Sequence, residues 1–173
     1  MTAFTPMTFD ESTLRLRCTV NGKMRSHDVP VRMTLADYLR DVLRLTGTHL
    51  GCEQGQCGAC TVRANGEVVR ACLMLAVQAE GMRIDTIEGL NASGELADLQ
   101  DAFFRHAALQ CGFCTAGMLI TADDALRSNP AITRDGVRAA LTGQLCRCTG
   151  YHAIVDAVVD TASLRRRAGE IDA

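Results

Sequence analysis

Residues 50–62 read LGCEQGQCGACTV and place three cysteines and three glycines within thirteen positions. This composition offers few large apolar side chains from which to build a core. The cysteines have the spacing C-x4-C-x2-C, and a fourth, Cys72, follows after eleven further residues. Plant-type [2Fe–2S] sites use this spacing and take their last ligand from a distant part of the chain. We therefore expect the first [2Fe–2S] cluster to be held by Cys52, Cys57, Cys60 and Cys72.

The glycines of this loop suit such a site. Gly51, Gly55 and Gly58 permit positive φ angles, so the loop can curl and bring amide N–H groups close to the sulfurs. A zinc site made of the same four thiols is the alternative, but zinc usually takes C-x2-4-C pairs from two separate knuckles. A single loop that supplies three ligands favours iron–sulfur over zinc. A thioredoxin-like motif at Cys57 and Cys60 is a weaker alternative, because such a motif should begin a helix in a βαβ unit.

A second set of four cysteines lies in the other half of the chain. Cys111 and Cys114 fall between the first two of four expected helices, and Cys146 and Cys148 fall between the last two. Both loops can meet at one end of a helical bundle, so we expect these four thiols to converge. A Rieske site would need two histidine ligands, and we expect surface or outer-sphere positions for His27, His49, His106 and His152. The ninth cysteine, Cys18, shares a strand face with Leu14 and Leu16 and should pack in the core.

Strand patterns dominate the first half. Apolar and polar residues alternate from residue 14 to 19, and Asn21-Gly22 predicts a hairpin turn into a second strand over 24–31. Strands over 61–64 and 67–71 flank a second turn at Asn65-Gly66, and a short strand is expected over 82–87. An amphipathic helix is predicted over 34–45, with Thr34 as its cap. Two hairpins crossed by one helix indicate a small β-grasp sheet.

The second half has helical periodicity only. Helices are predicted over 96–108, 115–128, 133–141 and 151–167, and four antiparallel helices make a small bundle. Residues 88–94 read EGLNASG and are expected to be a linker. The predicted fold is thus α+β, with a tail over 1–11, a ferredoxin-like β-grasp domain over 12–88, a four-helix domain over 89–167 and a second tail over 168–173.

Composition limits the classes of function. The chain has 173 residues, nine cysteines and a formal charge of −2, without the long basic stripe of a nucleic-acid binder. We expect neither a secretory signal nor a membrane span. A cytoplasmic location is therefore predicted, because clustered cysteines in a reducing compartment bind metal or do redox work more often than they form disulfides.

Three motifs in this order make the sequence recognisable. GCEQGQCGACTV with the later Cys72, then ALQCGFCTAGM, then LTGQLCRCTGY resemble the small iron–sulfur subunit of the molybdenum hydroxylases, the xanthine oxidase family. The resemblance covers about residues 12–162. It departs from the family pattern at three places. Ala116 stands where the family usually has proline, Gln144 stands where asparagine is common, and His152-Ala153 stands where a Gln-Asn pair is common.

The resemblance implies an electron-transfer subunit with two [2Fe–2S] clusters and no catalytic residues of its own. It implies that a large partner subunit holds the molybdopterin cofactor and the substrate, and that a medium partner subunit holds FAD, in a hetero-oligomer such as a dimer of heterotrimers. Electrons would pass through the cluster of the helical domain, then through the ferredoxin-like cluster, to FAD or another acceptor. The family pattern assigns the second cluster to Cys111, Cys114, Cys146 and Cys148, and places Gln110 and Cys148 beside the pterin.

Two other functions remain as alternatives at this point. A free two-cluster ferredoxin would use the same ligands, but a soluble carrier usually has a strongly charged surface, and this chain is near neutral and 47% hydrophobic. A zinc interaction module would use the cysteines without redox chemistry, and the ligand spacing argues against it.

Overall fold

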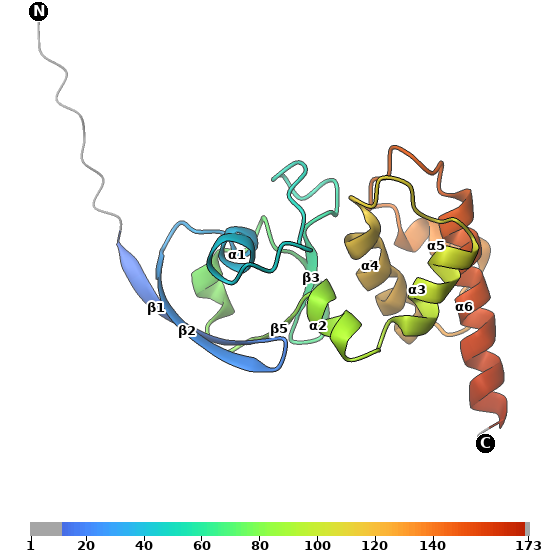
Figure 1. Cartoon of the computed structure of the whole chain (residues 1–173), viewed down its shortest axis with the longest axis horizontal. Coiled ribbons are helices and arrows are strands. Elements are labelled where there is room, and N and C mark those ends of the chain that lie inside the picture. The colour runs from blue at the N-terminus through green and yellow to red at the C-terminus, as the bar shows by residue number, and fades with distance from the viewer. Residues whose placement is uncertain (1–11, 172–173) are drawn as a thin grey trace, which may run out of the picture.

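The computed structural model describes residues 12–171 and shows a five-stranded sheet beside a group of helices (Figure 1). This confirms the α+β class. The tail predicted over 1–11 and the last two residues of the tail predicted over 168–173 lie outside the described residues. Within residues 12–171, no helix combines the length and the apolar character needed to cross a membrane.

Both predicted hairpins are present in the sheet. Its strands are β1 (Thr13–Val20), β2 (Lys23–Pro30), β3 (Thr61–Ala64), β4 (Glu67–Arg70) and β5 (Arg83–Asp85), in the order β2-β1-β5-β3-β4. The hairpins turn at the two Asn-Gly pairs, where all four residues have positive φ, as tight hairpin turns require. β5 lies between the hairpins, parallel to β1 and antiparallel to β3.

The helix expected over 34–45 is shorter and less regular than predicted. Thr34 caps it as expected, since its hydroxyl accepts from the backbone N–H of Asp37. However, α1 (Leu35–Asp37) passes directly into a π-helical turn, η1 (Tyr38–Val42). The wider turn rotates the later positions away from the sheet, so Tyr38 and Leu39 are fully buried whereas Val42 is exposed. A 3-10 turn, η2 (Ala76–Ala79), leads into β5.

Five helices make up the second half: α2 (Ile87–Ala92), α3 (Ala97–Arg105), α4 (Thr115–Ser128), α5 (Arg134–Ala140) and α6 (His152–Ile171). The four predicted helices correspond to α3–α6, and α6 continues four residues past its predicted end. The predicted linker over 88–94 is largely helical, because Ile87 and Leu90, one turn apart, pack against the helical core. A domain of four helices alone is thus not confirmed.

Each half has its own hydrophobic core, and β3 and α4 form much of the contact between them. The sheet core includes Leu16 and Tyr38, and the helical core includes Phe103 and Met118. Cys18 is 1% exposed in the sheet core, as predicted. The cysteine loops that precede β3, α4 and α6 lie along one side of the molecule (Figure 1).

Candidate iron–sulfur sites

The loop before β3 curls around its first thiol as the glycines predict. Backbone N–H groups of Gln54 and Cys57 donate to Cys52 Sγ, each at 3.4 Å. These donors, that of Gln54 first, stabilise the thiolate and lower the pKa of Cys52 to about 7. Gly55 and Gly58 have positive φ, of 77° and 76°. The loop therefore presents N–H donors to sulfur, as a negatively charged cluster requires.

Gly51 serves the same loop for a different reason than predicted. Its φ is not positive; instead, a Cβ at this position would lie 3.2 Å from Cys57 Sγ and 3.4 Å from the Phe113 ring. A Cβ here would be tight, because a thiol of the first set and an aromatic ring beside the second set both approach the backbone. Gly51 therefore spares space beside the thiol and does not supply a positive φ.

The second hairpin brings the fourth thiol of the first set into place. Thr61 pairs with Arg70 across the hairpin, and the Ala71 N–H donates to the Cys60 carbonyl at 3.2 Å. Cys60 and Cys72 therefore meet at the open end of the hairpin, and their thiols interact. Both are buried, and burial raises the pKa of Cys60 to about 11. The thiols of Cys52 and Cys57 interact in the same way.

The second set converges from two interhelical loops, as predicted. Cys111 and Cys148 are exposed, and their sulfurs lie 3.6 Å apart. Cys114 lies against Cys146 further in, and burial raises the pKa of Cys114 to about 12. Tyr151 closes this loop: it accepts a hydrogen bond from the Cys146 N–H at 2.8 Å and donates one to the Gln144 carbonyl at 3.1 Å.

The eight thiols thus form four pairs, two at each site. Within residues 12–171, no three His, Cys, Asp or Glu side chains converge on one point as ligands of a single metal ion would. A [2Fe–2S] cluster has two irons with two thiolates on each, so two neighbouring pairs are the donor arrangement it takes. The residues present fit one such cluster at each site.

The two sites lie side by side and are joined by direct contacts. The Leu145 N–H, next to Cys146, donates to the Cys57 carbonyl at 2.9 Å. His49 stacks on Phe113 with ring centroids 4.6 Å apart, and His49 Nδ1 lies 2.8 Å from the Phe113 carbonyl. These contacts link the loop of the first set to both loops of the second. His49 thus lies between the two sites, whereas His27 contacts Tyr38 and His106 contacts Asp160.

Gln144 is a buried polar residue whose place between the sites the sequence does not reveal. In the amide orientation that satisfies both ends, its nitrogen donates to the Gly58 carbonyl at 3.1 Å. Its oxygen accepts from Thr121 of α4 at 2.5 Å and from Arg70 of β4 at 3.1 Å. The departure from the family's asparagine was the only signal in the sequence, and it did not indicate a bridging role.

Residues around the second set face outward. Gln110, Cys111 and Cys148 are all exposed, and three large apolar side chains around them are 42–56% exposed: Leu109, Phe113 and Leu145. The first set is more enclosed, with two of its four thiols buried. The second site is therefore the more open of the two to a partner.

Comparisons with known proteins agree with this geometry. Residues 18–86 match the family described as 2Fe-2S iron-sulfur cluster binding domain, and residues 86–159 match the [2Fe-2S] binding domain family. The chain is 55% identical to the nicotine 6-hydroxylase small subunit of Paenarthrobacter nicotinovorans over 141 residues, which are 82% of this chain and 85% of that protein. It is 43% identical to the xanthine dehydrogenase iron-sulfur-binding subunit of Escherichia coli O157:H7 over 152 residues, 86% of this chain and 94% of that one.

A solved structure gives the same result. The crystal structure of quinoline 2-oxidoreductase from Pseudomonas putida 86 contains a chain that is 56% identical, with a TM-score of 0.84. The likeness covers 90% of this chain and 97% of that chain. The two proteins therefore share both halves of the fold described above.

Proposed function

The chain belongs to the small iron–sulfur subunits of the molybdenum hydroxylases, and from this premise we propose which of its residues serve each step of electron transfer. As in its relatives, its function is to conduct electrons from the molybdopterin centre of a multi-subunit oxidoreductase to FAD or another acceptor. When bound, two [2Fe–2S] clusters supply the one-electron chemistry for this transfer. The remaining roles belong to the residues of this chain.

Electrons enter at the second site. Cys111, Cys114, Cys146 and Cys148 hold the cluster nearer to the large molybdopterin-binding subunit. Gln110 hydrogen-bonds the pterin, since an amide offers both donors and an acceptor, and Cys148 connects this site to it. The exposure of Gln110, Cys111 and Cys148 on one outward-facing surface supports this direction.

Electrons leave through the first site, held by Cys52, Cys57, Cys60 and Cys72. One observation carries the transfer between the two sites: the hydrogen bond from the Leu145 N–H to the Cys57 carbonyl, at 2.9 Å. Leu145 adjoins Cys146 of the second set, and Cys57 belongs to the first. This route between the two ligand sets therefore runs through covalent bonds and one hydrogen bond.

Partners supply what this chain lacks. The large subunit holds molybdopterin and chooses the substrate, which accounts for relatives named for nicotine, caffeine and xanthine. A medium subunit with FAD, or another acceptor, receives the electrons, and the assembly is a dimer of heterotrimers.

Helices α3–α6 act as a four-helix bundle, with α2 as its link to the sheet. Nine free cysteines favour a cytoplasmic location.

The test compares single-ligand variants in the purified complex. EPR of the dithionite-reduced wild-type protein should give two S = 1/2 signals with about four irons per chain, as two dinuclear sites require. Cys148→Ser should slow the removal of electrons from molybdenum, and Cys57→Ser should slow their delivery to the acceptor, each followed by stopped flow. Cys18→Ala is the control and should keep both signals. Failure of both ligand variants at the same step would contradict the order.

A further inference from the structure

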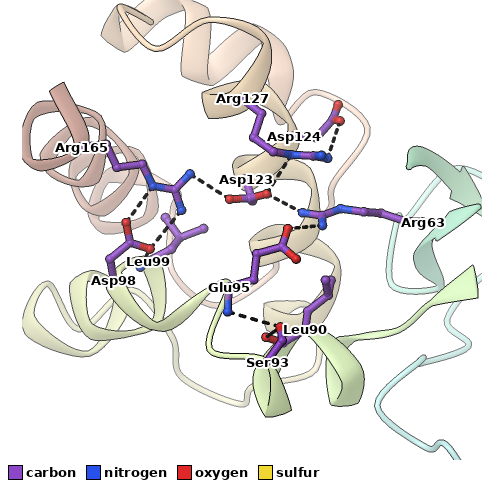
Figure 2. Close-up of polar contacts among 10 residues, drawn as sticks. All are labelled: Arg63, Leu90, Ser93, Glu95, Asp98, Leu99, Asp123, Asp124, Arg127 and Arg165. Atoms are coloured by element: carbon purple, nitrogen blue, oxygen red, sulfur yellow. Dashed lines mark hydrogen bonds and ion pairs between the residues drawn. The ribbon is translucent and has the colours of Figure 1, made fainter. Parts of the chain in front are cut away.

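A cluster of charged side chains with a buried centre joins the sheet to the helices (Figure 2). We call it the interface ion cluster, and it consists of Arg63, Glu95, Asp98, Asp123, Arg127 and Arg165. The side chains of Arg63 and Asp123 are 4% and 2% exposed. Burying charges is costly unless they are paired with good geometry, so the position of each member constrains the others.

Asp123 is the centre of this cluster. One carboxylate oxygen accepts from Arg63 and from Arg127 Nε, the latter at 3.1 Å, and the other accepts from Arg165 at 2.8 Å. The three arginines come from β3, α4 and α6, so a single carboxylate ties the sheet to two helices (Figure 2). Arg63 also pairs with Glu95. Arg63 is thus the member that the sheet contributes.

The ion cluster and the thiol sites lie at opposite ends of the same two elements. Arg63 follows Cys60 by three residues on β3, and Asp123 follows Cys114 by nine residues on α4. Nine helical residues span about 13 Å. At the thiol end, Gly117 of α4 packs on Gly58, where an added Cβ would lie 2.4 Å from the Gly58 carbonyl oxygen. The contact between β3 and α4 is therefore secured at two separate points.

We propose that the Arg63–Asp123 ion pair sets the separation and relative orientation of the two [2Fe–2S] sites. The inference rests on the proposed function. The glycine contact and the hydrogen bonds around Leu145 and Gln144 hold the two halves together at the thiol end, and the buried ion pair secures the far end of β3 and α4. Arg63 is a positioning residue: it touches no ligand, yet it holds the two ligand sets at the spacing on which transfer between them depends.

Arg63→Met is the variant of choice. It removes the charge that the sheet contributes but leaves Asp123 paired with Arg127 and Arg165, while Glu95 is 40% exposed and can be hydrated. The matched control is Arg83→Met. Arg83 pairs with Asp85 on the same strand, so its ion pair does not join the two halves.

The readout is the magnetic interaction between the two reduced clusters, measured by EPR in the whole complex, because it falls with the cube of their separation and depends on orientation. Arg63→Met should change this splitting while leaving the potential of each cluster unchanged. It should also slow electron transfer between the sites several-fold, because tunnelling rates fall steeply as the distance between two centres grows. Arg83→Met should leave splitting and rate as in the wild type.

Unchanged splitting and rate in Arg63→Met would overturn the proposal, as would the same change in both variants. If Arg63→Met does not accumulate with its clusters, Arg63→Lys provides the same test, since lysine keeps the charge but not the planar two-pronged geometry. An intermediate splitting is expected for it, and wild-type splitting would overturn the proposal. A different result would contradict the proposed function instead: dithionite reduces both clusters and they interact, but electrons from the molybdenum subunit do not reach them. The two failures can be told apart because reduction by dithionite needs no partner.

Discussion

The two thiol sites are built in different ways. The first is enclosed by its own chain: a glycine-rich loop supplies N–H donors, a hairpin delivers the last thiol, and Cys60 and Cys72 are buried. The second opens outward, with Cys111 and Cys148 exposed at the tips of two interhelical loops. An enclosed site depends on close packing within the chain, whereas an open one can be completed by a partner. This difference is the basis of the proposed order, in which the open site faces the large subunit.

The largest expected effect is on the free energy of unfolding, and it should differ between two glycines of the cysteine loops. Both Gly58 and Gly112 have positive φ, but a Cβ at Gly58 would lie 2.5 Å from the Gly143 carbonyl oxygen, whereas Gly112 has open space around it. Gly58→Ala should lower the free energy of unfolding by at least about 3 kcal/mol, since overpacking adds to backbone strain. Gly112→Ala should cost only the strain, about 1–2 kcal/mol. Thermal unfolding measures both, and equal losses would show that the sites are packed alike.

The next effect concerns the side chain that closes the second site. Tyr151→Phe removes the acceptor of the Cys146 N–H and the donor to the Gln144 carbonyl. We expect a loss of about 1–2 kcal/mol from the partly buried groups left unpaired, together with a change in the EPR signal of the second cluster alone. Tyr38→Phe, whose hydroxyl contacts His27 in the sheet half, is the control and should leave both signals unchanged. A change in the first signal would mean that the two sites are not independent in this respect.

A smaller effect depends on pH and is confined to the helical half. Hydrogen bonds from Arg165 hold the pKa of Asp98 below its usual value, so the carboxylate stabilises the folded state above its unfolded pKa of about 4 and loses this contribution as the pH falls. Asp98→Asn should reduce the acid dependence of unfolding by less than about 1 kcal/mol, because the group is partly exposed. Asp135→Asn is the control and should leave the acid dependence of unfolding unchanged, because the Asp135 side chain is 89% exposed. Denaturant unfolding at pH 7 and at about pH 3, below the unfolded pKa, tests this, and identical curves for both variants would contradict it.

The smallest effect is chemical and leaves stability unchanged. In protein stripped of iron, Cys52 should alkylate first near neutral pH, because its pKa is lowered to about 7 and the thiolate is the nucleophile. Cys60 and Cys114, whose burial raises their pKa to about 11 and about 12, should react more slowly than Cys52. Mass spectrometry of timed samples gives the order. Equal alkylation rates at Cys52 and Cys60 would mean that Cys60 is no longer buried once the iron has been removed.

Local patterns in the sequence predicted the elements well where one stretch of chain decides the outcome. Both hairpins turn at their Asn-Gly pairs, and α3–α6 occupy the expected segments. Predictions failed where packing overrides local pattern. The segment expected to be a linker forms α2 because Ile87 and Leu90 find a core to pack against, and the amphipathic helix after β2 widens into a π turn.

The sequence by itself determined which thiols could act together, because ligand spacing and turn glycines are local properties that a chain carries wherever it folds. Only the tertiary structure decided how the two sets meet. The contacts that join them connect residues far apart in the chain, as in Leu145 to Cys57, Gln144 to Gly58 and Arg63 to Asp123. Such contacts depend on how β3 packs against α4, and no periodicity or spacing within either half encodes that geometry.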